Sequence, residues 1–465
     1  MRERRSREPH FSVAIFPQSS TLFRTAAPED PLNTPRKLRY GLEDRPPLLE
    51  TLSLGLQWFF VLLPGVIIIG NLVGRIEFTS IADQALSLRK IAFVCAVILL
   101  VQHFRGHRLP LIPGPSTILL VGILSSRGAS FPAIYSAMIL GGILLAVMGL
   151  TGLFGRVRRF FTPRVIAVVL LLIAFTLCPA ILDLFTRGEG TASPFEGILF
   201  ATGLTFAMIL LYRLAGEAWR SHIILAGTLA GSLLYFLLFP GALRDAGAPG
   251  ALVGPLFGNL LPGFSLDPGL LTAFFICYIA LAINDLGSME SLNVLLDLPE
   301  GSRRINRGIA VTGIGNVFAG FLGVIGPVNY SMSPGMILST GSAARFPLVL
   351  SGVLLLLLSF SPAVTGIAGR IPSPVIGAVL LYITGSQIVA GLLIVFESTH
   401  ALDFEEGLII GLPVLLGTMV AFAPPDVIQA LPPSLRSVLG NGFVIGVGTS
   451  LLLEHGILRR KGKLP

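Results

Sequence analysis

The chain has 465 residues, of which 53% are hydrophobic and 12% charged, and its mean hydropathy is +0.82. Since a soluble domain carries about 25% charged residues, this composition excludes a water-exposed globular protein and indicates an integral membrane protein with many helices. The formal net charge of +8 is best explained by Lys and Arg on the cytoplasmic side, and no nucleic-acid partner is expected.

The N-terminal region, residues 1–50, is basic at its start and contains no apolar h-region. We expect it to be a cytoplasmic tail without a cleavable signal peptide. Apolar runs follow and predict one transmembrane domain at 51–456, with a short cytoplasmic tail at 457–465. The three cysteines lie inside apolar runs without metal-ligand spacing, so neither disulfides, a metal site nor a cofactor is expected.

A helix needs about 20 apolar residues to cross a membrane. This rule predicts fourteen transmembrane segments, and the even number places both ends of the chain on the same side. The basic clusters RVRRFFTPR and RRINR assign that side to the cytoplasm. In chain order, the predicted segments are 54–73, 88–104, 109–124, 132–154, 163–183, 195–213, 221–240, 268–293, 306–325, 329–341, 345–369, 372–394, 405–423 and 434–455.

Proline and glycine interrupt the third and the tenth of these segments. RLPLIPGPSTILL (108–120) and GPVNYSMSPGM (326–336) contain too little continuous helix to cross a hydrocarbon core of about 30 Å. Proline removes a backbone donor, and unsatisfied backbone groups cannot face lipid. We therefore expect both segments to be half extended and half helical, and to be buried in protein or to line a wet cavity.

The two broken segments each stand third in a set of seven. This placement predicts an inverted repeat of seven plus seven segments, in which the broken segments meet near the middle of the bilayer. Their short helices would direct amide donors and partial positive charge into a shared pocket. The alternative is that they are two unrelated loops rich in Pro and Gly.

The eighth segment combines a long apolar run with a polar end, in LLTAFFICYIALAINDLGSMESLNVLL (270–296). One interpretation is that Asn284, Asp285, Ser288 and Glu290 contact a substrate, an ion or a proton inside the membrane. The other is that the helix ends near Ile283 and that these residues lie at the cytoplasmic boundary.

Two basic residues, Arg89 and Lys90, stand at the start of the predicted second segment, where we expect them to snorkel to the membrane interface. The sequence contains no HExxH, GxSxG or Walker motif, so nothing in it indicates an enzyme.

Several stretches resemble the nucleobase–ascorbate transporters, also called xanthine/uracil permeases. The order and spacing of these stretches, which cover most of residues 40–395, make the resemblance specific. They are YGLEDRPPLLETLSLGLQWFF (40–60), RLPLIPGPST (108–117), AIYSAMILGGILLAVMGLTGLFGRVRRFFTP (133–163), INRGIAVTGIGNVFAGFLG (305–323) and RIPSPVIGAVLL (370–381).

The resemblance implies an all-α polytopic membrane protein with a core domain and a gate domain. The core would comprise segments 1–4 and 8–11, about 54–154 and 268–369, and the gate segments 5–7 and 12–14, about 163–240 and 372–455. Segments 3 and 10 would carry short strands before their half-helices. It also implies a small-molecule substrate between core and gate, alternating access, proton symport and a homodimer in the inner cell membrane.

The sequence departs from this family at two positions. The family usually has a glutamate where Asn284 stands, and another where Met332 stands. Asn284 still offers a donor and an acceptor to an amide edge, whereas Met332 cannot replace a carboxylate. LGSMESL (286–292) with GIGNVFAGFLG (313–323) is also similar to the sulfate permeases, where an acidic residue at the place of Glu290 can help to hold sodium.

Three functions follow from these observations. The first is a secondary transporter that moves a nucleobase-like ring or a small organic anion. The second is an inorganic anion transporter of the sulfate or bicarbonate type, and the third is a membrane scaffold that transports nothing. For the first, we expect a coupling proton or sodium ion at Asp285 or Glu290 and a pocket lined by Asn284, Ser288, Ser116, Thr117, Ser331 and Met332.

Overall fold

A computed structural model defines the fold. Most of the predicted N-terminal tail, and the chain from residue 459 onward, lie outside the residues that the structure describes. Those residues are 38–126, 128–153, 160–187, 192–216, 222–244, 251–258, 260, 263–296, 298, 301–330, 333–368, 370–398, 403–432 and 438–458.

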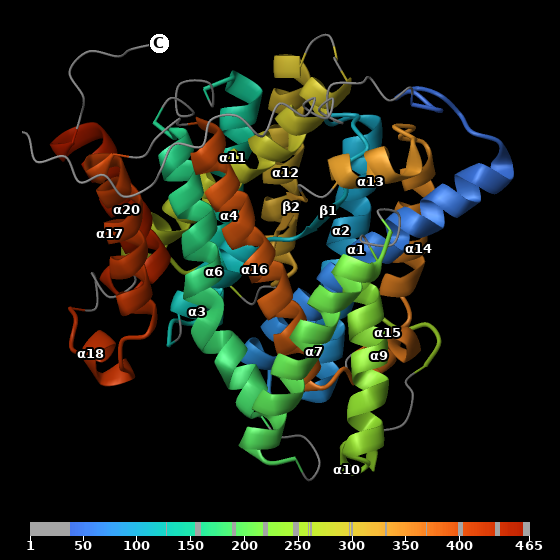
Figure 1. Ribbon diagram of the computed structural model, residues 1–465, viewed down its shortest axis with the longest axis horizontal. Helices are drawn as coiled ribbons and strands as arrows, with labels where there is room; N and C mark the ends of the chain where they lie inside the picture. The colour runs from blue at the N-terminus through green and yellow to red at the C-terminus, as the bar shows by residue number, and fades with distance from the viewer. Residues whose placement is uncertain are drawn as a thin grey trace, which may run out of the picture. The chain divides into compact units, whose positions relative to one another are not determined.

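The described residues are mostly helical, with two strands of three residues (Figure 1). The first half of the chain contains α1 Leu48–Glu77, α2 Ile81–Phe104, β1 Pro113–Pro115, α3 Thr117–Ser125, α4 Phe131–Thr151, α6 Pro163–Thr186, α7 Pro194–Leu214, α9 Ile223–Leu238 and α10 Gly241–Arg244. The second half contains α11 Pro268–Leu296, α12 Gly301–Phe321, β2 Pro327–Asn329, α13 Ser333–Thr340, α14 Pro347–Ser359, α15 Pro362–Ala368, α16 Ser373–Ser398, α17 Phe404–Ala421, α18 Pro425–Gln429, α20 Gly442–Leu452 and the π-helical turn Leu453–Ile457.

Eight of the described helices are long and apolar enough to cross a membrane: α1, α2, α4, α6, α7, α11, α16 and α17. The bent pair α14–α15 would make a ninth span, and α9 and the last helix are shorter apolar helices. The described part of the chain is therefore a multi-pass helical membrane protein, as the composition predicts.

Helices α4 and α12 pack closely against each other. A Cβ atom added to Gly313 would lie 2.3 Å from Ala146 N, and one added to Gly149 would lie 2.4 Å from Ala310 N, so the two backbones touch. Small residues allow this approach, and van der Waals contact of this kind drives helix association in a bilayer, where lipid tails weaken the hydrophobic drive.

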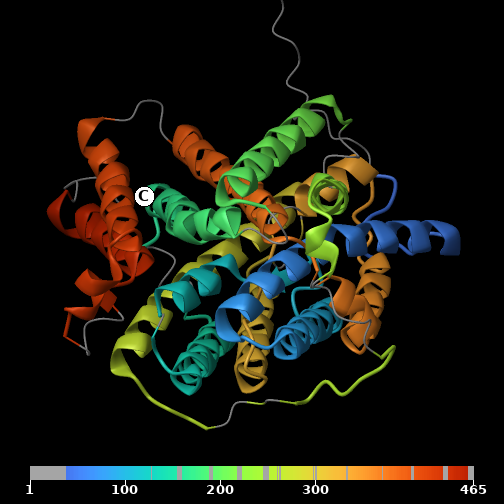
Figure 2. The ribbon, with the colours of Figure 1, turned by 90° about the horizontal axis from the view of Figure 1, so that it is seen from below.

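The helices pack in two groups. In one, α4 packs on α12 and α11, and α14 packs on α2 and α1; in the other, α16 packs on α6 and α7, and α17 packs on α20 and α6. In both views the α17–α20 pair lies on one side of the bundle and α1 with α14 on the other (Figures 1 and 2). Fewer contacts join the groups, among them those of α3 with α6 and of α1 with α9.

Side-chain caps define where several helices of the second group begin. Ser193 forms a capping box with Glu196 at α7, and Asp403 accepts the Glu406 N–H at 2.8 Å at α17. Asn441 caps α20 in the same way. These side chains satisfy amide donors that the first helical turn leaves unpaired.

The second and the eleventh predicted segments differ from the structure. The second segment begins at Ile81 and not at residue 88, because the polar first turn with Asp83 is helical. The predicted span 345–369 is broken between α14 and α15 with a bend of 94°. Pro362 has no N–H to continue the helix, and beyond the bend the carbonyl groups of Ser359 and Phe360 accept bonds from Arg89 and from Gly254 N–H.

Candidate functional site

The two broken segments meet as an antiparallel pair of strands near the centre of the first helix group. In this pair Pro113 faces Asn329, Gly114 faces Val328 and Pro115 faces Pro327. The contact between residues 108–120 and 326–336 that the sequence predicts is therefore confirmed, as is their half-extended, half-helical form.

The edges of this small sheet explain the gathering of prolines. Ser116 N–H donates to Gly326 O, and Tyr330 N–H donates to Ile112 O. In an antiparallel ladder with these bonds, positions 113, 115, 327 and 329 direct their backbone groups away from the partner strand. Three of the four are proline and have no N–H, so Asn329 presents the one outward N–H of the described strands.

Side chains of α11 and α12 satisfy the outer edge of β2 in place of a third strand. Asn329 N–H donates to Asp285 Oδ1 at 2.8 Å, and the Ser288 hydroxyl lies 3.1 Å from Asn329 O. Asn316 Nδ2 donates to Pro327 O at 2.9 Å. Since backbone groups buried in a membrane must be satisfied inside the protein, these three side chains are what permits a strand here.

Asp285 is the centre of a buried hydrogen-bond chain that crosses three helices. Its Oδ2 accepts the Thr312 hydroxyl at 2.6 Å, and Thr312 Oγ1 in turn accepts Gln102 Nε2 at 3.1 Å. All three side chains are 0–1% exposed. Among the described residues no cationic side chain forms an ion pair with Asp285, so hydrogen-bond donors alone balance the carboxylate.

The start of α3 lies beside the second helix group. Ser116 is buried and caps the helix by accepting Leu119 N–H at 3.3 Å, while Thr117 is half-buried. Gln387 of α16 reaches across, and its Nε2 lies 3.4 Å from Thr117 Oγ1. Its Oε1 is buried and has no hydrogen-bond partner among the described residues, which leaves an acceptor at the helix start.

The polar end of the eighth segment belongs to the helix. Because α11 continues to Leu296, the interpretation that the helix ends near Ile283 is wrong. Asn284 and Glu290 are half-buried, whereas Asp285 and Ser288 are fully buried. Ser331 and Met332 lie outside the described residues, so the structure places only the other members of the predicted set.

Arg89 and Lys90 do not snorkel, and that prediction is wrong. Both are buried, at 5% and 3% exposure, because α2 begins two turns before them. Arg89 donates to Ser359 O and Gly254 O, and Lys90 Nζ donates to Leu322 O at 3.0 Å. These cations therefore satisfy carbonyl groups at the ends of α14 and α12, where the helix dipole favours positive charge.

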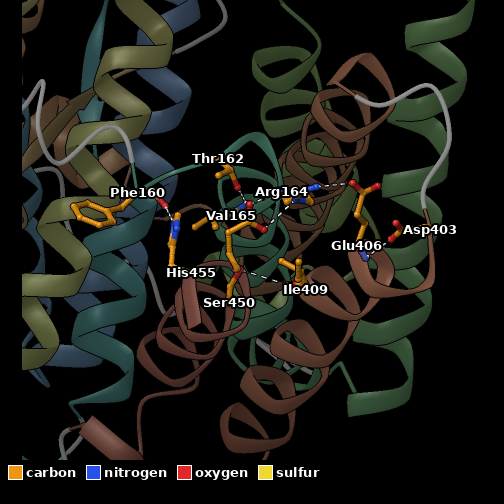
Figure 3. Close-up of polar contacts among 10 residues, drawn as sticks. Phe160, Thr162, Arg164, Val165, Asp403, Glu406, Ile409, Ser450 and His455 are labelled. Carbon is orange, nitrogen blue, oxygen red and sulfur yellow. Dashed lines mark hydrogen bonds and ion pairs between the residues drawn. The ribbon is translucent and has the colours of Figure 1, made fainter. Parts of the chain in front are cut away.

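A second polar cluster joins the ends of α6, α17 and α20 (Figure 3). Arg164 binds both oxygens of Glu454, at 2.7 and 3.0 Å, and Glu406 Oε1 at 2.7 Å. The π-helical turn that ends α20 carries Glu454 and His455, and His455 Nε2 donates to Phe160 O at 2.6 Å. Such two-pronged pairing orients the guanidinium firmly, so the cluster fastens three helix ends together.

Sequence reasoning missed the residues that support the strands. Thr312, Asn316 and Gln387 are single polar residues within apolar or glycine-rich runs, and only the tertiary fold brings them to β2 or α3. The one signal in the sequence was that Asn316 is a polar residue inside the predicted span 306–325, and the structure buries its side chain completely.

Two short helices that each follow one of two paired strands, inside a multi-pass helical bundle, are typical of a class of membrane transporter folds. The transmembrane domain of a cyanobacterial bicarbonate transporter, BicA, has a similar fold, with a TM-score of 0.58 and 16% identity. That comparison covers 80% of this chain and 96% of the BicA domain.

The chain belongs to the Permease family, whose xanthine/uracil permease model matches residues 49–425. A putative purine permease of Clostridium perfringens, CPE0397, is 28% identical over 91% of this chain and 93% of its own length. The xanthine permease of Bacillus subtilis is 26% identical over 87% of this chain and 93% of its own. The protein is therefore a permease and not an enzyme.

Proposed function

We propose that the protein is a secondary active transporter that carries a nucleobase-like planar ring or a small organic anion by cation symport with alternating access. The observation that carries this proposal is the pairing of β1 with β2, since it brings segments from the two halves of the chain together beside α11. Discontinuous helices that meet in this way build substrate sites in secondary transporters.

We further propose fourteen segments arranged as an inverted repeat of seven plus seven. Helix packing supports this arrangement. If each segment corresponds to the one seven places later, the α4–α12 pair corresponds to α14–α2, and the contact of α1 with β1 corresponds to that of α11 with β2. Similarly, α17–α20 corresponds to α7–α9.

The two packing groups support a division into core and gate. The core would take about 54–154 and 268–369, and the gate about 163–240 and 372–455, with the substrate held between them. We place both termini in the cytoplasm, the protein in the inner membrane and the transporter as a homodimer. The proposed lining is Asn284, Ser288, Ser116, Thr117, Ser331 and Met332. We add Gln387 from the gate side, because its Nε2 lies 3.4 Å from Thr117 Oγ1.

The amide groups of this proposed site match a neutral lactam edge. Asn284 stands where the family usually has a glutamate, and Gln387 offers a buried acceptor that has no partner among the described residues. An amide presents both a donor and an acceptor, and a heterocycle with adjacent N–H and C=O groups presents the complementary pair. The coupling cation would be carried on α11, by Asp285 or Glu290.

A transporter of inorganic anions is the second candidate, and one observation favours it. Both positions at which the family usually carries a glutamate are uncharged here, Asn284 and Met332, and a site with few carboxylates accepts an anion more readily. Amide donors at the start of α3 would then hold the anion.

Uptake into proteoliposomes tests these functions. Labelled xanthine, urate, uracil, sulfate and bicarbonate would each be supplied with an imposed proton or sodium gradient. We expect gradient-driven uptake of at least one heterocycle, and at least a tenfold loss of that uptake in Asn284→Leu and Gln387→Leu. Gln57→Leu is the matched control, because the Gln57 amide donates to Ser53 of its own helix.

Two results would contradict the proposal. Uptake of sulfate or bicarbonate alone would favour the second candidate, and no uptake of any compound would favour a scaffold. If Asp285→Asn and Glu290→Gln both leave gradient-driven uptake unchanged, the coupling cation is not carried on α11.

A further inference from the structure

The start of α13 depends on how β2 is held, because this short helix begins at Ser333, shortly after the strand ends at Asn329. The inner edge of β2 is paired with β1. The outer edge depends on side chains, and its one backbone donor, Asn329 N–H, has Asp285 Oδ1 as its acceptor. Any change in that acceptor is transmitted directly to the backbone of the strand.

We propose that Asp285 is a positioning residue, which fixes β2 and the start of α13 in the geometry that receives the substrate. The inference rests on the proposed function and deepens it, because it leaves Glu290 as the residue on α11 that carries the coupling cation. Asp285 is 0% exposed and each of its oxygens accepts a hydrogen bond, whereas Glu290 is half-buried on the same helix.

The rest of the hydrogen-bond chain supports a positioning role. Thr312 donates to Asp285 Oδ2 and is itself held by Gln102 Nε2, which also donates to Gly308 O at 2.9 Å. The carboxylate is thereby fixed relative to α12 and α2 as well as to its own helix. A group that must bind and release a cation in each cycle needs access and spare coordination, and the geometry of Asp285 provides neither.

Charge and hydrogen-bond acceptance can be separated at this position. Asp285→Asn removes the charge but keeps an oxygen that can accept Asn329 N–H, and the Thr312 hydroxyl can reverse its role because it both donates and accepts. Asp285→Leu removes the acceptor as well. A coupling residue requires the charge, whereas a positioning residue requires the acceptor.

Transport kinetics of the two variants in proteoliposomes provide the first test, with labelled xanthine, urate or uracil, whichever the unaltered protein carries. We expect Asp285→Asn to retain gradient-driven uptake within about threefold, and Asp285→Leu to raise KM at least tenfold. Loss of gradient dependence in Asp285→Asn would overturn the inference, as would an unchanged KM in Asp285→Leu.

Hydrogen exchange of the Asn329 amide provides a second test, which requires no substrate and remains valid if none of the compounds is transported. We expect slow exchange in the unaltered protein and in Asp285→Asn, and exchange at least tenfold faster in Asp285→Leu. If Asp285→Leu does not fold, Thr312→Val is used, with an expected increase of about threefold. Thr205→Val is the matched control, since Thr205 donates to carbonyl groups of α7 and α16 far along the chain from the strands. Equal exchange in Thr312→Val and Thr205→Val would then overturn the inference.

Discussion

The two strands differ in how they deal with backbone N–H groups that point away from the partner strand. In β1 both outward positions are proline, so the strand has no outward N–H that would need a partner. In β2 one outward position is proline, and the other, Asn329, has its N–H satisfied by Asp285. Proline removes the outward donors of β1, and Asp285 supplies an acceptor for the outward donor of β2. β1 therefore has no outward N–H to satisfy, whereas the outward N–H of β2 depends on a single buried carboxylate.

The difference indicates which substitutions should destabilise this fold most. Removing a buried partner leaves an unsatisfied group, which costs more than the hydrogen bond itself contributes. Substitutions that leave a buried polar group without a partner should therefore cost most stability, and the loss should grow with the charge and burial of that group. Four substitutions test this ranking, each through the free energy of unfolding measured in detergent micelles.

The largest effect is expected at Arg164. Arg164→Gln leaves the buried carboxylates of Glu406 and Glu454 without their cation, and breaking a buried ion pair costs about 3–5 kcal/mol. The control is Arg187→Gln, whose ion pair with Asp183 is half exposed and should contribute less than about 1 kcal/mol. Equal losses in the two variants would show that burial does not set the scale.

Pro115→Ala tests whether β1 needs proline because proline has no N–H. The new N–H would point outward from the buried edge, and an unsatisfied buried donor costs about 1–3 kcal/mol. Pro194→Ala is the control, because Pro194 is an exposed residue at the first position of α7, where an N–H needs no helical partner. If the two substitutions destabilise the protein equally, the missing donor is not the reason for proline in β1.

Tyr330→Phe removes a hydroxyl that donates to a backbone carbonyl group of β1. The Tyr330 hydroxyl donates to Pro115 O at 3.1 Å, and the loss of one such neutral bond should lower the free energy of unfolding by about 1 kcal/mol. The ring itself stays, which preserves its packing beside Gly114. A loss larger than that of Pro115→Ala would show that a lost neutral hydrogen bond costs more here than an unsatisfied buried donor.

The smallest effect is expected at the partly exposed ion pair between Glu43, before α1, and Arg345, before α14. Arg345 hydrogen-bonds the Glu43 carboxylate and holds its pKa below the ordinary value. The pair therefore stabilises the fold above the unfolded-state pKa of about 4.3, and this stabilisation is lost as the pH falls through the lower folded-state pKa. Because the Glu43 side chain is 59% exposed, Glu43→Gln should cost only about 0.2–1 kcal/mol at pH 7. A loss that persists unchanged at low pH would rule out the ion pair as its cause.

Much of the fold could be predicted from the sequence because membrane helices are set by the length of apolar runs. The interruption of residues 108–120 and 326–336 was readable for the same reason, since proline and glycine deny both segments a continuous helix. Their contact, now seen as paired strands, followed from equal placement in the two halves.

The supporting residues could not be predicted, because their partners come from distant segments. Arg89 and Lys90 are ordinary interface cations until the ends of α14 and α12 are known to lie beside them. Asp285 was singled out as a polar residue in a membrane helix, but its role depends on a backbone amide of β2 that no pattern in α11 reveals. The presence of a polar residue in an apolar run is readable from sequence, whereas its burial and the identity of its partner are not.

The pairing of β1 with β2 also has a consequence for biosynthesis. A ribosome completes the first strand roughly 200 residues before the second, a delay of about 10–40 s at about 5–20 residues per second. During that interval the first strand waits in the translocon or the bilayer without its partner. Because two of its three residues are proline, β1 has fewer unpaired backbone N–H groups during that interval. The order of synthesis therefore favours proline in the strand that is made first.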